Sequence, residues 1–373
     1  MILTHPHQSG RPGPHQPAGE VPRLVAWEVT RACNLACAHC RAAAIYDPDP
    51  NELSTKEGRR LIDQIAAMGR DIILILTGGE PLMRADIFDL AAYGTGRGLR
   101  VVMAPNGTLI TRENARRMKT CGIQRISVSI DGATAEEHDS FRGVPGAFDR
   151  LVKGVGYARE TGLEFQVNTT VTRHNLPQIE AIQELAVSLG AAAHHIFLLV
   201  PTGRGRQLTE EIISAQEYEE VLGWFYERRD KTPLQLKATC APHYYRILRQ
   251  RAREEGKKVN FATFGLDALS RGCLGGQGFV FVSSTGQVQP CGYLELDCGQ
   301  VRENDFGQIY RTSPIFLDLR DQNLYKGKCG VCEFWRVCGG CRARAYAATG
   351  DYLTEEPLCL YQPQKTKGLG KAS

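Results

Sequence analysis

The sequence lacks any apolar run long enough to cross a bilayer. Its longer apolar stretches, such as 72–76 and 196–200, span five residues each, whereas a membrane helix needs about 20. The N-terminus also lacks the basic and then apolar pattern of a secretion signal. We therefore expect no membrane span and no export.

The chain also has little net charge. The formal charge is +4 over 373 residues, too small to indicate nucleic-acid binding. The locally basic stretch 246–258 fits a solvated helix face. The length predicts one large or two packed domains. Residues 1–23, rich in Pro, Gly and His, are predicted to be a disordered tail. Residues 364–373 are predicted to be a C-terminal tail.

What the sequence does contain is thirteen cysteines. Without a secretion signal we expect no disulfide framework, and we interpret them as metal-binding thiolates in a reducing cytoplasm. Cys33, Cys37 and Cys40 form a C-x3-C-x2-C loop. Thiolates are the usual ligands of iron–sulfur clusters, and three of them leave one iron of a four-iron cluster free. A zinc site needs a fourth ligand, and His39 is poorly placed to supply it.

From residue 24 to residue 200, aliphatic runs alternate with stretches of helical periodicity. The runs lie at 24–29, 72–76, 100–104, 125–130, 163–171 and 195–200. Ser54 and Glu57 form a capping-box pattern at the start of the first helix. This alternation predicts a parallel sheet covered by helices. Six units fit an α/β fold of the partial (β/α)6 TIM-barrel type, with its chemistry at the C-terminal strand ends.

The candidate site residues fall at those strand ends. At or just after the C-terminal ends of the second to fifth predicted strands lie Gly78, Gly79, Glu80, Asn106, Ser129, Asp131 and Asn168. For Asn168, a strand-pairing or core hydrogen-bond role is an equal alternative. Cys121 is interpreted as a core thiol.

After residue 200 the alternation ends. Helical stretches at 213–229 and 242–255 flank a strand-like segment at 234–239, and 279–283 with 287–290 form a hairpin pattern. Eight further cysteines gather here as Cys273, Cys291, Cys298, Cys329, Cys332, Cys338, Cys341 and Cys359. Four of them spell C-x2-C-x5-C-x2-C, a spacing that also suits a zinc ribbon.

The cysteine loop and the later Gly-Gly-Glu-Pro segment together resemble the radical S-adenosylmethionine (SAM) superfamily. This resemblance implies that the cysteine loop holds a 4Fe–4S cluster on which SAM is cleaved. Carbonyls near Gly78 and Gly79 would accept the ammonium hydrogens of SAM, since glycine permits close approach. Ser129 and Asp131 resemble ribose-contacting positions. His39 departs from the family, because the residue before the last cysteine is often aromatic.

The later cysteines resemble the SPASM extension, which carries auxiliary clusters. The resemblance implies one such cluster on Cys329, Cys332, Cys338 and Cys359. Three further cysteines match ligands of a second cluster in some members, namely Cys273, Cys291 and Cys341. No obvious fourth ligand lies upstream of them, so a complete second cluster stays open. We therefore expect a barrel over 24–235 and an α+β auxiliary-cluster domain over 236–363.

Segments 237–246, 290–298 and 337–346 resemble radical SAM enzymes of the sirohaem-dependent haem pathway. The resemblance implies a tetrapyrrole substrate, and we expect oxidative decarboxylation of two propionates of iron-coproporphyrin III to vinyls, giving haem b. Electrons would come from a donor such as ferredoxin or flavodoxin. Alternatives are a sister reaction (didecarboxysirohaem side-chain removal or synthesis of the nitrite reductase haem), peptide maturation, or a zinc-binding scaffold. Candidates for binding the substrate are Arg204, Arg206, His243, Tyr244, Tyr245 and Arg246.

Overall fold

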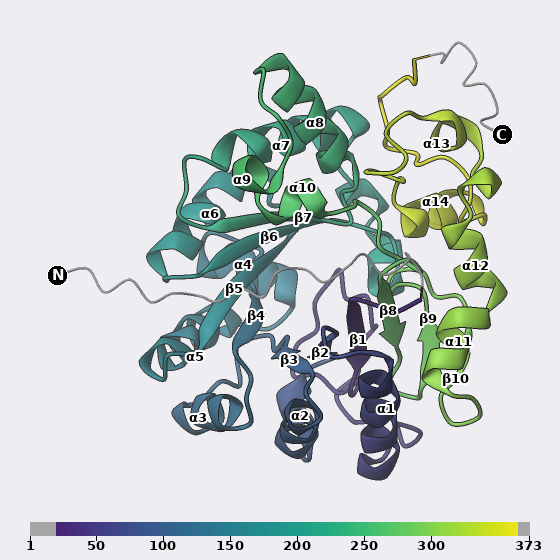
Figure 1. Ribbon diagram of the computed structural model, residues 1–373. Coiled ribbons are helices and arrows are strands. Elements are labelled where there is room, and N and C mark those ends of the chain that lie inside the picture. The colour runs from purple at the N-terminus through teal and green to yellow at the C-terminus, as the bar shows by residue number, and fades with distance from the viewer. Residues whose placement is uncertain (1–19, 365–373) are drawn as a thin grey trace.

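The computed structural model describes residues 20–364, which form an open and mostly parallel sheet with helices around it (Figure 1). The sheet has ten strands in the order β10-β9-β8-β1-β2-β3-β4-β5-β6-β7. The tails predicted at 1–23 and 364–373 lie outside the described residues, except for 20–23 and 364.

The first six strands match the predicted runs to within two residues at each end. They are β1 (Leu24–Glu28), β2 (Ile73–Thr77), β3 (Arg100–Met103), β4 (Arg125–Ser129), β5 (Glu164–Val171) and β6 (Ala193–Leu198), and each pairs in parallel with the next. The helices between them are α1 (Thr55–Met68), α2 (Ile87–Gly96), α3 (Arg112–Thr120), α4 (Ala135–Arg142), α5 (Ala147–Glu160) and α6 (Ile179–Ser188). The predicted partial barrel is confirmed.

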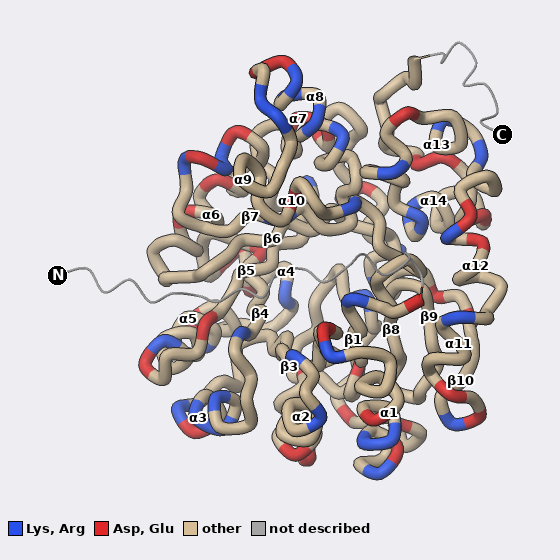
Figure 2. Tube along the Cα trace, in the orientation of Figure 1, with Lys and Arg blue, Asp and Glu red and all other residues tan. Residues whose placement is uncertain are grey.

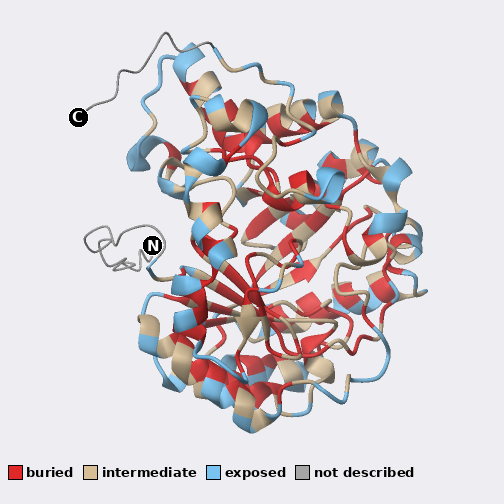
Figure 3. Ribbon diagram, turned by 90° about the vertical axis from the view of Figure 1, so that its right-hand side faces the viewer, coloured by how far each residue is buried: buried red, intermediate tan, exposed pale blue. Residues whose placement is uncertain are grey.

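Packing between the first helix and the sheet explains why these elements form. Ser54 caps α1, and the reciprocal bonds of the capping box with Glu57 are both present. The apolar stripe of α1 covers the buried indole of Trp27 on β1. Gly58 is required there, because a Cβ atom would lie 2.5 Å from that indole. Figure 3 shows buried residues gathered on the strands and inward helix faces, with exposed residues outside.

Two further parallel strands extend the barrel at its edges. β7 (Gln235–Thr239) pairs with β6, and β8 (Phe279–Val282) pairs with β1. The predicted hairpin is β8 with the antiparallel β9 (Gln287–Gln289), and β10 (Gly299–Gln300) follows. The sheet thus continues across the boundary expected at residue 235, because β8 buries Val280 and Val282 in the barrel core.

The other helices follow β6 in the chain. They are α7 (Ala215–Arg228), α8 (His243–Glu254), α9 (Phe261–Phe264), α10 (Leu266–Leu269), α11 (Phe306–Thr312), α12 (Pro314–Arg320), α13 (Gly327–Val331) and α14 (Arg342–Thr349). α7 and α8 share a second apolar core with β6 and β7. None of the described helices combines the length and apolar character needed to cross a membrane.

A buried ion pair joins α14 to the barrel. The Arg344 guanidinium donates to Glu356 Oε2 at 3.0 Å and to the carbonyls of Leu198 at 3.2 Å and Cys240 at 3.0 Å. Glu356 also accepts the Cys341 N–H at 3.0 Å. Both charged side chains are buried. This pair therefore positions the end of β6, Cys240 and the cysteine-rich segment together.

Replacing Arg344 with Met tests the contribution of the Arg344–Glu356 ion pair to stability. The variant leaves the Glu356 carboxylate buried without its cation, and we expect the free energy of unfolding to fall by about 3–5 kcal/mol. The double variant Arg344→Met/Glu356→Leu should recover part of that loss, since it removes the orphaned charge. Anaerobic denaturant titration of the cluster-loaded protein measures both. An unchanged midpoint for Arg344→Met would contradict the assignment.

Candidate functional site

The cysteine loop follows β1 and is fastened to the end of α4. The N–H groups of Ala36 and Ala38 donate to the carbonyls of Arg142 and Phe141, at 3.2 and 3.0 Å. Arg204, which follows β6, donates to the carbonyls of Cys37 at 2.9 Å and Ala44 at 2.8 Å. These bonds hold the loop above the C-terminal strand ends.

Each sulfur of the loop lies within reach of an N–H donor. The Leu35 N–H lies 3.4 Å from Cys33 Sγ, the Ala44 N–H 3.4 Å from Cys40 Sγ, and the Arg142 guanidinium 3.5 Å from Cys37 Sγ. Burial raises the pKa of the Cys33 thiol to about 11. Hydrogen bonds to thiolate sulfurs are characteristic of iron–sulfur sites, so this donor set fits a cluster.

The Gly-Gly-Glu segment packs directly on this loop. The Gly79 N–H donates to Thr30 at 2.8 Å and the Glu80 N–H to Ala32 at 2.7 Å. A Cβ atom at Gly79 would lie 2.3 Å from the Ala32 carbonyl oxygen, and one at Gly78 would lie 2.4 Å from that of Thr30. Glycine is therefore required here by the loop backbone itself. Within residues 20–364, neither glycine carbonyl accepts a hydrogen bond, which fits the expected role toward an ammonium group.

Glu80 links the second and third strand ends. Its buried carboxylate accepts the N–H groups of Leu82 at 2.9 Å and Asn106 at 2.6 Å. Burial raises the pKa of Glu80 to about 7. The Asn106 amide donates to Asn34 at 2.8 Å and lies 3.9 Å from Cys33 Sγ. Asn106 thus braces the cysteine loop.

Ser129 and Asn168 lie side by side. They are register partners on β4 and β5, and both are half-buried. The Asn168 side chain accepts from Gln166 at 3.0 Å. This geometry is compatible with a cofactor contact by Asn168 and also with a structural hydrogen bond within the sheet.

Asp131, which the resemblance places near the ribose, lies in a buried hydrogen-bond network. Its carboxylate is fully buried, accepts the Thr170 N–H at 2.7 Å and pairs with Arg142. Although burial favours the acid form, Arg142 holds the pKa of Asp131 below its usual value. His39 Nε2 lies 3.9 Å from the same carboxylate, and its ring stacks on Phe141 at 4.4 Å. Oδ1 of Asp131 thus accepts a backbone N–H, while Oδ2 pairs with Arg142 beside Cys37.

Arg142→Gln tests whether this buried cation acts on the cluster. A positive charge beside a ligand sulfur favours the reduced state, so its loss should make the reduction potential of the SAM-binding cluster more negative. We expect a shift of about 60 mV, the one-electron equivalent of a tenfold change. Redox titration followed by electron paramagnetic resonance measures it, with Arg142→Lys as the charge-conserving control. Equal potentials in all three proteins would contradict this role.

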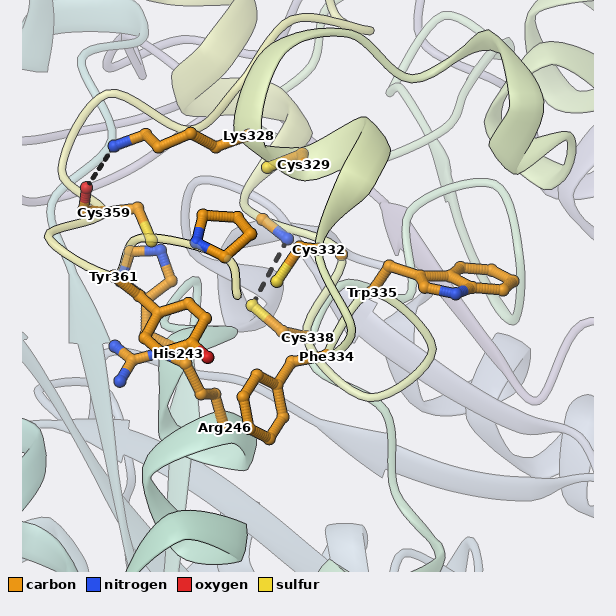
Figure 4. Close-up of a pocket in the computed structure, with 13 residues that line it drawn as sticks. His243, Arg246, Lys328, Cys329, Cys332, Phe334, Trp335, Cys338, Cys359 and Tyr361 are labelled. Atoms are coloured by element: carbon orange, nitrogen blue, oxygen red, sulfur yellow. Dashed lines mark hydrogen bonds between the residues drawn. The ribbon is translucent and has the colours of Figure 1, made fainter. Parts of the chain in front are cut away.

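Four later cysteines line one cavity, which Figure 4 shows with their side chains as sticks. Cys329, Cys332, Cys338 and Cys359 contribute to its wall, as do aromatic side chains such as Phe334 and Trp335. The Gly340 N–H lies 3.5 Å from Cys338 Sγ, and the Arg342 guanidinium lies 3.4 Å from Cys329 Sγ. These are the residues expected to hold an auxiliary cluster, and the donor set fits one.

A second group contains a cysteine that the sequence analysis missed. Cys240, Cys291 and Cys341 pack on one apolar cluster. Burial raises the pKa of Cys240 well above its usual value, and Cys341, Cys291 and Cys273 act in the same direction. Cys240 follows β7, so recognising 234–239 as a barrel strand would have placed it at a C-terminal strand end.

Of the thirteen cysteines, Cys121 and Cys298 lie outside these three groups. Cys121 is buried in the barrel core, as expected. Within residues 20–364, no three Cys, His, Asp or Glu side chains converge tightly enough to hold a single metal ion. In a 4Fe–4S site each thiolate binds a separate iron.

The six residues considered for substrate binding have other neighbours. Arg204 holds the cysteine loop, Arg206 pairs with the exposed Glu295 at 2.9 Å, and Arg246 pairs with Glu219 at 2.5 Å. His243 and Arg246 line the cavity of the first auxiliary group. The other two, Tyr244 and Tyr245, are buried in the core that α7 and α8 share.

Comparison with known proteins agrees with this arrangement. Residues 27–186 match the family model described as "Radical SAM superfamily", and residues 273–339 match that of the SPASM "Iron-sulfur cluster-binding domain". The "AdoMet-dependent heme synthase" of Nitratidesulfovibrio vulgaris is 60% identical over 343 residues, covering 92% of this chain and 93% of that protein. The chain belongs to this family of radical SAM enzymes.

Two further similarities are more distant. The "Fe-coproporphyrin III synthase" of Methanosarcina barkeri is 33% identical, over 90% of this chain and 87% of that protein. The structure of Streptococcus suis SuiB bound to S-adenosylmethionine has a TM-score of 0.71 and 17% identity, covering 92% of this chain and 78% of that one. It supports the fold. As a radical SAM and SPASM protein, the chain uses SAM, a SAM-binding 4Fe–4S cluster and auxiliary iron–sulfur clusters.

Proposed function

We propose that this chain converts iron-coproporphyrin III into haem b by oxidative decarboxylation of two propionate side chains to vinyl groups. The observation that carries the proposal is the 60% identity to an AdoMet-dependent heme synthase over nearly the whole of both chains. Identity to the Fe-coproporphyrin III synthase is far lower, at 33%. The first relative is named for making haem and the second for making Fe-coproporphyrin III. The higher identity to the heme synthase therefore supports the step that consumes Fe-coproporphyrin III.

The balance of the reaction calls for two kinds of site. Each propionate loses one hydrogen atom, one electron and carbon dioxide when it becomes a vinyl group. SAM and its cluster, when bound, would supply the 5′-deoxyadenosyl radical that takes the hydrogen atom. An auxiliary cluster would accept the electron. In our proposal Cys33, Cys37 and Cys40 hold the first cluster, and Cys240 completes a second auxiliary set.

Tyr293 is near cysteines of both of these sites. It packs on the same apolar cluster as Cys240 and Cys291. Burial raises the pKa of its phenol, and the charges that act on it come from Cys240, Arg41, Cys291 and Cys40. Cysteines of both groups therefore act on Tyr293. In our proposal the substrate lies beside Tyr293, where it reacts at the first group and loses an electron to the second.

Arg41 joins the same region to the barrel. It follows Cys40, pairs with Glu28 at 2.6 Å and lies 4.4 Å over the Phe281 ring of β8. A Cβ atom on Gly292, next to Cys291, would lie 3.2 Å from Arg41 Cδ. The residue after the last ligand of the cysteine loop thus contacts the segment that carries Cys291. In our proposal Arg41 and Tyr293 position the substrate and exclude water.

Anaerobic incubation of reduced protein with SAM and iron-coproporphyrin III tests the reaction. We expect a divinyl product and two 5′-deoxyadenosines per haem b, as detected by mass spectrometry. Didecarboxysirohaem, offered in parallel, separates the sister reaction. Unchanged iron-coproporphyrin III with fully loaded clusters, or turnover of didecarboxysirohaem instead, would sink the proposal.

Cys240→Ser tests the ligand that sequence reasoning missed. Loss of one thiolate from a four-cysteine set should remove the second auxiliary cluster, so the iron content should fall by about four atoms per chain. Cys298→Ser is the matched control, because Cys298 lies outside the three groups, and its iron content should stay at the wild-type level. Equal iron content in the two variants would count against Cys240 as a ligand.

A further inference from the structure

A solvent-filled hollow lies on the outer surface between α3 and α5. It has a volume of about 390 Å³ and is lined by Thr108, Ile110, Thr111, Arg112, Arg150, Lys153 and Tyr157. The arginines, the lysine and Thr111 are exposed, whereas Thr108 and Ile110 are buried at its floor. None of these residues belongs to the contacts described above for the cysteine loop, the auxiliary groups or the Arg344–Glu356 ion pair.

The hollow is separated from the SAM-binding cysteines by very little protein. The Thr108 hydroxyl accepts from the Asn34 amide at 2.8 Å and donates to Asn106 at 2.7 Å. The Asn106 amide in turn lies 3.9 Å from Cys33 Sγ. Helix α5 supplies Arg150, Lys153 and Tyr157 to the lining. Ala147, at the start of the same helix, packs in one buried cluster with Cys33 and Cys37. Two independent sets of contacts thus connect the floor and wall of the hollow to the cysteine loop.

The charge of the hollow is positive. Within residues 20–364, Lys153 has no ion-pair partner, and Arg150 donates only to the Pro145 carbonyl, at 3.3 Å. Arg112 is neutralised by Glu160 at 2.7 Å. The first turns of α3 and α5 contribute Arg112 and Arg150 to the lining, and helix N-termini carry partial positive charge. The acidic residues of these turns, Glu113 and Asp149, are not part of the lining. Figure 2 shows charges of both signs on these two helices, whereas the charged residues that line the hollow are all basic.

We propose that this hollow is the docking surface for a small acidic electron-transfer protein that reduces the SAM-binding cluster. A cationic surface steers an acidic partner and fixes its orientation. One electron passes from the reduced carrier to the oxidised cluster, while no bond is made or broken and no proton moves. The inference rests on membership in the radical SAM superfamily and is independent of which tetrapyrrole is the substrate.

Charge reversal at Arg150 and Lys153 tests the docking surface. The readout is 5′-deoxyadenosine formed from SAM without tetrapyrrole, driven either by reduced flavodoxin or ferredoxin or by dithionite. We expect Arg150→Glu/Lys153→Glu to lower the protein-driven rate about tenfold at low salt and to leave the dithionite-driven rate unchanged. Raised salt should slow the wild type toward the variant.

A matched control carries the same change of charge on another surface. Arg253 and Lys258 are exposed in and after α8 and have no ion-pair partner in the described chain, so Arg253→Glu/Lys258→Glu should leave both rates unchanged. Carbodiimide cross-linking offers a readout without turnover, since it should join the Lys153 amine to carboxylates of the carrier. The proposal is overturned if the two double variants behave alike, if the dithionite-driven rate falls equally, or if Lys153 forms no cross-link.

Discussion

The site depends on how closely the cysteine loop and the Gly-Gly-Glu segment approach each other. Gly78 and Gly79 leave no room for a Cβ atom against the carbonyls of Thr30 and Ala32, and backbone hydrogen bonds tie the two segments together. This packing fixes the loop between the first two strand ends. From there the sulfurs meet N–H donors, Glu80 reaches Asn106, and Arg142 reaches Cys37. Every other feature of the site is arranged around that fixed loop.

Burial gives the same region its electrostatic character. The thiol of Cys33 has a raised pKa, so a thiolate there needs a compensating positive charge, which cluster iron supplies when bound. Arg142 places a second cation beside Cys37, and Asp131 holds that cation in place. The two auxiliary groups repeat this pattern with Arg342 beside Cys329 and Arg344 near Cys341. Buried arginines next to cysteines are therefore a common feature of all three groups.

Local patterns in the sequence predicted much of this architecture. The six aliphatic runs, the capping box at Ser54 and the spacing of Cys33, Cys37 and Cys40 are short-range signals, and they located the barrel and its first site. Long-range pairing left no such signal. Nothing near residue 279 indicates that β8 pairs with β1, and the sequence alone did not show that β7 would bring Cys240 to Cys273.

Side-chain roles were the hardest to foresee. Arginines at 204 and 246 are as plausible for carboxylate binding as for internal bonding, and only the fold shows that they serve the loop and Glu219. Likewise, the internal partners of both Asp131 oxygens became visible only in the fold. In each case the choice depended on which backbone segment lay nearby, and that is a property of tertiary packing.

We propose that eleven cysteines form three cluster-binding groups. Iron and acid-labile sulfide counted per chain in anaerobically purified, brown protein test it most directly. The account predicts about twelve atoms of each, because each 4Fe–4S cluster contains four irons. A colourless protein that carries zinc, or a count of about four, would contradict it.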